Sequence, residues 1–136
     1  NQIMAIKEES VTDQKNSLTV CLDNILRHAG ITRNTEYDLA QGKTAIQILE
    51  ENMTGVQVLD LSGCSLDAVL YYVNQDIPVL AILEDGEAVL VTGFNEFNVV
   101  IMEPSTGKLY KKGMNDATTW FAENGNHFIS YMKIDN

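Results

Sequence analysis

Residues that build metal centres and disulfide frameworks are scarce in this sequence. Two cysteines, Cys21 and Cys64, and two histidines, His28 and His127, occur among its 136 residues. The cysteines form no CxxC pair and neither histidine stands at ligand spacing from them, so we expect no metal site and no cofactor. A disulfide between the cysteines is left open, but two free, partly buried thiols are the simpler expectation.

Basic residues are also few, and long apolar runs are missing. Nine lysines and arginines stand against nineteen acidic residues, which gives a formal net charge of −10. This charge repels the phosphates of nucleic acids and anionic membrane surfaces, so neither is an expected partner. No apolar run reaches membrane-spanning length and no signal peptide is visible, which argues against direct membrane insertion. The acidic excess favours solubility or a basic partner.

What the sequence does contain is ordinary globular composition, with 45% hydrophobic and 21% charged residues. This is enough to bury a core, and the length predicts one domain over residues 1–136. Residues 1–15 are polar and weakly patterned, so we expect an extended lead-in there. The chain begins with asparagine rather than methionine, which suggests a domain excised from a larger protein or a processed start.

The first half of the chain carries helical patterns. Residues 16–31 have an apolar stripe at i, i+3, i+4 spacing, a capping residue at Asn16 or Ser17, and a closing glycine. Three polar residues of this segment are expected on its solvent face: Asp23, Asn24 and Arg27. Further helices are expected over residues 35–42, 43–53 and 65–75, and a strand over residues 55–61.

The second half changes to short runs rich in valine and isoleucine. The segments "PVLAILED", "EAVLVTGFN" and "NVVIMEP" are separated by turns and predict strands of an antiparallel sheet. Residues 106–113 and 127–134 predict two more strands, and residues 115–125 a helix capped by Asn115. Helices followed by a sheet indicate an α+β fold, with the N-terminal helices packed on an antiparallel β-sheet.

This ordered set of segments resembles the papain-like peptidases of the C39 type, including the C39-like domains of bacterial proteins. The resemblance covers residues 16–133 and rests on "PVLAIL", "DGEAVLVTGFN", "VVIMEP" and "NDATTWFAENGNHFISYM". In that family a nucleophilic cysteine opens the first helix, a histidine on the second of these strands is the general base, and an aspartate at the end of the next strand orients it. The resemblance therefore implies a papain-like (C39-like) fold.

All three catalytic positions of the family are changed in this chain. Counting thirteen residues back from the glycine that ends the helix gives Ser17 for the cysteine, while Glu87 replaces the histidine and Glu103 the aspartate. A serine hydroxyl needs a strong base, and a glutamate with an ordinary pKa of ~4.3 is a weak one. The oxyanion-hole glutamine of the family falls on Val11, and the nearest glutamine is Gln14. No catalytic residue is therefore expected.

Ordinary structural roles account for most of the candidate residues. Ser17 is typical of a helix N-cap, and the sequence leaves open whether it replaces a native cysteine. Cys21 lies on the apolar stripe and is expected to be buried, but a register shifted by one turn would make it the nucleophile, with His127 or His28 as base. His28 is otherwise expected to interact with the helix C-terminus, and His127 to start the last strand. Three aromatic residues are expected in the core: Tyr71, Trp120 and Phe121.

Three functions are compatible with these residues. The leading hypothesis is a catalytically inactive C39-like pseudopeptidase whose old cleft binds a peptide segment or a neighbouring protein domain. Its acidic rim, Asp85, Glu87 and Glu103, favours basic ligands. The alternative is an active papain-like cysteine peptidase using Cys21, and the third is an architectural domain. The usual settings of the family imply an extracytoplasmic or membrane-associated place within a larger bacterial protein.

Overall fold

The structure is a computed structural model that describes residues 2–3 and 16–134. Its helices are α1 (Ser17–His28), α2 (Glu36–Ala40), α3 (Ala45–Asn52), α4 (Leu66–Val73) and α5 (Met114–Glu123). Its strands are β1 (Gln2–Ile3), β2 (Val56–Asp60), β3 (Val79–Ile82), β4 (Ala88–Phe94), β5 (Asn98–Glu103), β6 (Lys108–Gly113) and β7 (Phe128–Lys133). The predicted helices and strands from residue 16 onward are confirmed. Apart from β1, the predicted lead-in, with Val11 and Gln14, lies outside the described residues.

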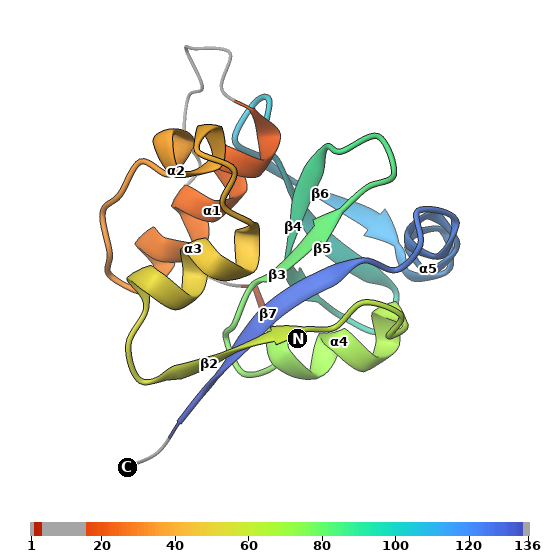
Figure 1. The fold of residues 1–136 in the computed structure, drawn as a ribbon. Coiled ribbons are helices and arrows are strands. Elements are labelled where there is room, and N and C mark those ends of the chain that lie inside the picture. Colours follow the sequence, from red (N-terminus) through yellow and green to blue (C-terminus); the bar gives the residue numbers. More distant parts are fainter. Residues whose placement is uncertain (1, 4–15, 135–136) are drawn as a thin grey trace.

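The strands form one antiparallel sheet in the order β2-β7-β3-β4-β5-β6 (Figure 1). The strands β3 to β6 follow one another as hairpins, whereas the last strand, β7, inserts between β2 and β3. The short strand β1 pairs with the end of β4, at Gly93 and Phe94. Because β4 and β5 pair antiparallel, the start of β4 and the end of β5 lie next to each other.

Helices cover both faces of this sheet (Figure 1). On one face α1 and α3 pack against strand residues such as Leu80 and Leu90. On the other face α4 and α5 pack against Val79 and Val91. Successive side chains of a pleated strand point to opposite faces of the sheet, so neighbouring residues of one strand pack into different cores. Because both faces are buried, the central strands have continuous apolar sequences. The predicted α+β class, with N-terminal helices on an antiparallel sheet, is confirmed.

Several local predictions need correction. The N-cap of α5 is Gly113, so the predicted cap at Asn115 is wrong. Tyr71 is 63% exposed and is not a core residue, whereas Phe121 is buried and Trp120 is partly buried against it. The cap of α1 is Asn16, whose Oδ1 accepts a hydrogen bond from the backbone N–H of Leu18 at 2.7 Å.

Two polar residues of α1 are buried rather than on a solvent face. Asp23 and Asn24 are each 6% exposed, so the prediction for these two is wrong. The Oδ1 of Asp23 accepts hydrogen bonds from the backbone N–H and the hydroxyl of Thr35, both at 2.8 Å. The amide of Asn24 donates to the carbonyl of Val20 at 2.8 Å. Internal hydrogen bonds make such burial tolerable, and the Asp23–Thr35 contact holds the segment before α2 against α1.

Within residues 2–3 and 16–134, no helix is long and apolar enough to cross a bilayer.

Candidate functional site

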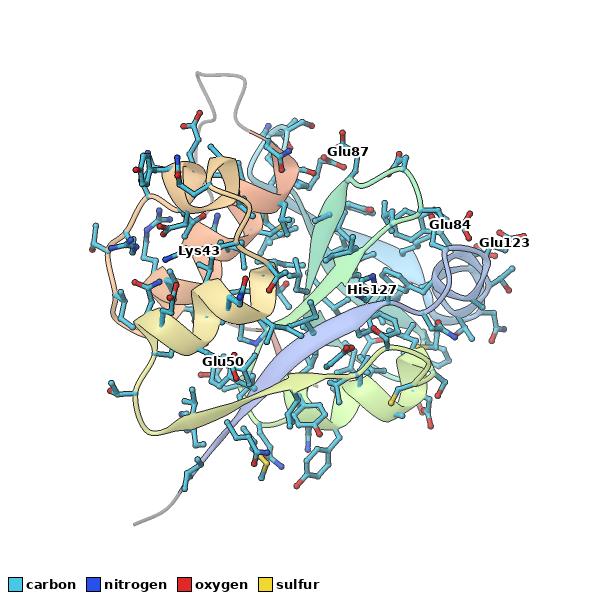
Figure 2. All side chains as sticks on the ribbon, viewed as in Figure 1. Lys43, Glu50, Glu84, Glu87, Glu123 and His127 are labelled. Carbon is cyan, nitrogen blue, oxygen red and sulfur yellow. The ribbon has the colours of Figure 1, made fainter. Side chains whose placement is uncertain are left out.

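The side chains of Ser17 and Glu87 meet where α1 begins and β4 is about to begin. The hydroxyl of Ser17 donates a hydrogen bond to Oε2 of Glu87 at 2.5 Å. The same hydroxyl oxygen accepts the backbone N–H of Ala88 at 2.8 Å. Figure 2 shows Glu87 at this end of β4, next to the first turn of α1. The structure therefore joins two of the residues that the family resemblance placed at its catalytic positions.

The position of Glu87 is set by the turn of residues 84–86. Gly86 has φ +87°, a left-handed conformation that glycine adopts without strain, and its N–H donates to the carbonyl of Leu83 at 2.9 Å. Oδ1 of Asp85 accepts the backbone N–H of Glu87 at 2.9 Å, which is the usual local bond of an aspartate in a turn. The turn thus fixes the backbone of Glu87 before β4 starts, and Asp85 lies at the same rim.

Ser17 is available for this contact because it does not cap its helix. Asn16 caps α1 by accepting the N–H of Leu18, so the expected N-cap role for Ser17 is wrong. Ser17 is instead the first helical residue, and its hydroxyl points across to the strand. The helix N-terminus also places a partial positive charge near Glu87, which favours a carboxylate there.

Glu103, at the end of β5, is engaged with its own turn. Its Oε1 accepts hydrogen bonds from the backbone N–H of Ser105 at 3.1 Å and from the Ser105 hydroxyl at 3.0 Å. In the part of the chain that the structure describes, no hydrogen bond links Glu103 to Glu87. Its negative charge acts on a neighbouring side chain nevertheless: burial first, and Glu103 second, raise the pKa of the Tyr110 hydroxyl. Glu103 therefore shapes the local field without orienting Glu87.

Cys21 lies one turn beyond Ser17 and is fully buried in the core between α1 and the sheet. Burial, and to a smaller extent the charge of Glu103, raise the pKa of the Cys21 thiol well above its ordinary value. A papain-type nucleophile needs the opposite, a lowered pKa and an accessible sulfur. Both Cys21 and Cys64 are free thiols, as expected, and Cys64 is partly buried.

A consequence of the raised pKa is alkaline sensitivity. The unfolded chain releases the thiol proton near pH 8.5, whereas the folded chain keeps it, so ionisation of Cys21 lowers the free energy of unfolding as pH rises above that value. We expect the stability difference between the wild type and Cys21→Ala to shrink above pH 8.5 by up to about 1.4 kcal/mol per pH unit. Urea unfolding at pH 7 to 10.5 measures it, and a difference that stays constant to pH 10 contradicts the burial of a neutral thiol.

His28 lies at the opposite end of α1 from Ser17. Its Nε2 is 3.0 Å from the backbone carbonyl oxygen of Asp76 and 3.6 Å from Oδ2 of the same residue. His28 comes eleven positions after Ser17, which is roughly 17 Å along the axis at 1.5 Å per residue. His28 thus ties the end of α1 to the segment after α4.

His127 is exposed and directly precedes β7, so the strand begins one residue later than predicted. Its carbonyl accepts the N–H of Ile82, and β3 stands between β7 and β4, so the backbones of His127 and Glu87 are roughly 10 Å apart. Figure 2 shows His127 at the start of β7 and Glu87 nearer the edge of the molecule. His127 also has a small effect on Asp60: the pKa of this carboxyl is lowered mainly by hydrogen bonds from Ser62, with a smaller contribution from His127.

A cavity of about 560 Å³ opens at the C-terminal end of α1, with His28, Met53, Asp76, Tyr131 and Lys133 among its lining residues. This hollow is at the far end of the helix from Ser17 and Glu87. In the described residues, no three histidine, cysteine or acidic side chains lie close enough together to hold a metal ion.

The helices on an antiparallel sheet, with the first turn of α1 against the start of β4, have the arrangement of a C39-like peptidase fold, as a solved structure shows. Among solved structures, a candidate C39-like peptidase from Bacillus anthracis matches with a TM-score of 0.78 and 14% sequence identity, over 100% of both chains. At this identity the likeness shows the fold. No protein-family model matches the sequence, and no curated protein matches it.

Proposed function

We propose that this chain is a catalytically inactive C39-like domain, a pseudopeptidase, that binds a peptide segment or a neighbouring protein domain. The observation that carries the proposal is the 2.5 Å hydrogen bond from Ser17 to Glu87. It occupies the place where the family resemblance expects a thiol beside an imidazole. A hydroxyl donating to a carboxylate is a stable contact, and it supplies neither the thiolate nor the proton-shuttling ring that the papain mechanism uses.

The positions of the remaining nucleophile and bases support the same conclusion. Cys21 is buried with a raised pKa, which disfavours the alternative of an active cysteine peptidase. His28 is bound to Asp76 at the other end of the helix, and His127 is two strands away from Glu87. A base must reach within hydrogen-bond distance of its nucleophile, allowing for looser geometry in unliganded sites. Neither histidine is placed to do so for Cys21 or Ser17 without a large rearrangement.

The ligand we propose is basic, because the rim of the old site carries three carboxylates. Asp85 and Glu87 are exposed and Glu103 is partly exposed. Their carboxylates accept hydrogen bonds from backbone and hydroxyl groups, and in the described residues none of the three forms an ion pair. Uncompensated carboxylates attract lysine and arginine side chains and repel acidic segments.

Peptide binding tests this proposal directly. We expect a lysine- and arginine-rich peptide to bind saturably, and Glu87→Lys to weaken binding at least tenfold, because the variant inverts the central charge of the rim. Glu50→Lys is the matched control, since Glu50 is exposed on α3 and undergoes the same change of charge. Fluorescence anisotropy at low and physiological salt measures both affinities, and the wild-type affinity should fall as salt rises.

Two results of the peptide-binding experiment would contradict binding at this rim. Equal weakening by Glu87→Lys and Glu50→Lys would assign the binding to net charge instead of to this rim. No saturable binding of basic or neutral peptides would favour a purely architectural domain.

A further inference from the structure

The strand β6 ends the sheet on one side. It pairs with β5 along its full length of six residues, and it is the terminal strand in the sheet order of the described residues. Figure 1 shows β6 beyond β5 at the margin of the sheet, with α5 following it. A terminal strand leaves backbone N–H and C=O groups directed away from the sheet, and these can pair with another chain.

The outward groups of β6 can be assigned from its register. The N–H of Met114 donates to the carbonyl of Phe97, which makes this a hydrogen-bonded pair of the β5–β6 ladder. Hydrogen-bonded and non-hydrogen-bonded pairs alternate in an antiparallel ladder, so Leu109 and Lys111 belong to the second kind. The backbone N–H and C=O of Leu109 and Lys111 therefore point away from β5.

This strand is basic in a strongly acidic chain. It contains Lys108, Lys111 and Lys112, which are three of the nine lysine and arginine residues in a sequence with a net charge of −10. The ammonium of Lys112 lies 4.9 Å from the ring centre of Trp120 on α5, whereas Lys108 and Lys111 are exposed. None of the three forms an ion pair within residues 16–134. Lys108 and Lys111 thus bring positive charge to this edge beside outward backbone groups, and Lys108 stands opposite Glu103 in the β5–β6 register.

We propose that the free edge of β6 accepts an extended acidic segment of a partner protein as an added strand. Backbone hydrogen bonds at Leu109 and Lys111 would supply the pairing, and Lys108 and Lys111 would select glutamate or aspartate side chains. A second copy of this chain is disfavoured there, because two β6 strands would bring lysines against lysines. This edge adjoins the acidic rim of the proposed function at Glu103, the register partner of Lys108, and it takes ligands of the opposite charge.

The probe is a six-residue peptide of alternating glutamate and valine with blocked ends, matched to the length of β6. We expect saturable binding with amide shifts in two-dimensional NMR at Leu109, Lys111 and Gly113. The double variant Lys108→Glu, Lys111→Glu should weaken binding at least tenfold. The control Lys133→Glu makes the same kind of charge change at an exposed site on β7 and should change affinity less than twofold.

A second pair of measurements tests the backbone contact. Lys111→Pro removes an outward N–H, and Lys111→Ala removes only the charge, so the proline variant should bind more weakly than the alanine variant. If the proline variant does not fold, a probe with N-methyl groups on alternate amides makes the test on the wild type, which should then lose binding. Equal affinity for the methylated probe, shifts centred on Lys133, or dimerisation through β6 in sedimentation experiments would each overturn the proposal.

Discussion

In a Cys64→Ser background, Cys21 should react with iodoacetamide on the order of 100-fold more slowly than a cysteine introduced by Ser17→Cys. Cys21 is fully buried, so the sulfur is reached only when the protein opens locally, and an opening cost of about 3 kcal/mol already slows the reaction by that factor. Its raised pKa slows the reaction further, because the thiolate is the reactive form. Position 17 is partly exposed and needs no opening.

The Cys64→Ser substitution removes a partly buried thiol, whose own reaction with iodoacetamide would otherwise add to the measured rates. The same proteins in denaturant are the control, and both cysteines should then react at one rate. A Cys21 that labels in the folded protein as fast as a small free thiol would place an accessible nucleophile one turn further along α1. That result would favour the cysteine peptidase hypothesis.

Asp23→Ala should lower the free energy of unfolding by roughly 2–4 kcal/mol. The substitution leaves the N–H and the hydroxyl of Thr35 buried without their acceptor, and Thr35 is 0% exposed. At roughly 3–5 °C per kcal/mol for a chain of this size, the melting temperature should fall clearly. Urea unfolding followed by circular dichroism measures the change.

Two further variants show whether the effect belongs to this contact. Asp23→Asn keeps an oxygen acceptor and should cost less than Asp23→Ala. Thr35→Val removes the hydroxyl, and in a double-mutant cycle with Asp23→Ala it should show a coupling of about 0.5–3 kcal/mol. Additive losses, or a loss below about 1 kcal/mol for Asp23→Ala, would contradict the role given to this pair.

Much of the fold follows from hydrophobic periodicity. The stripe through Cys21 in α1 and the valine-rich runs of β3, β4 and β5 predict their elements because burial on one helix stripe or on both sheet faces leaves a direct trace in the sequence. The turn of residues 84–86 can also be predicted from the sequence, since the dipeptide Asp-Gly favours a turn through its local conformational preferences. The family resemblance could place Glu87 because this residue directly follows the turn and opens the matching strand.

Hydrogen bonds between residues far apart in the sequence produce no comparable periodic pattern. Asp23 reads as a solvent-facing residue because its burial depends on Thr35, twelve residues away and outside the helix. Ser17 reads as an N-cap because the neighbouring Asn16 supplies the same chemistry, and nothing local shows which of the two caps the helix. The family resemblance therefore located Ser17 and Glu87, but not the bond between them.

The contact between Ser17 and Glu87 gives the glutamate at the start of β4 a physical role. A histidine at this position would pair with a thiol at the helix N-terminus, whereas a glutamate pairs with a hydroxyl donor and with the positive end of the helix. In the inactive domain that we propose, serine and glutamate at these two positions are chemically matched. Their hydrogen bond connects α1 to the start of β4 without the thiol and imidazole that the papain mechanism requires.

Hydrolysis of amide substrates is the measurement that bears most directly on the central claim of an inactive domain. A mixture of fluorogenic peptides with basic, apolar and acidic residues should be followed from pH 3 to pH 9 for the wild type, Ser17→Ala and Cys21→Ala. We predict that all three release fluorophore at the rate of buffer alone at every pH. Turnover by the wild type that is lost in Ser17→Ala would reveal a serine nucleophile with Glu87 as base, turnover lost in Cys21→Ala would reveal a cysteine peptidase, and either result would contradict the proposal.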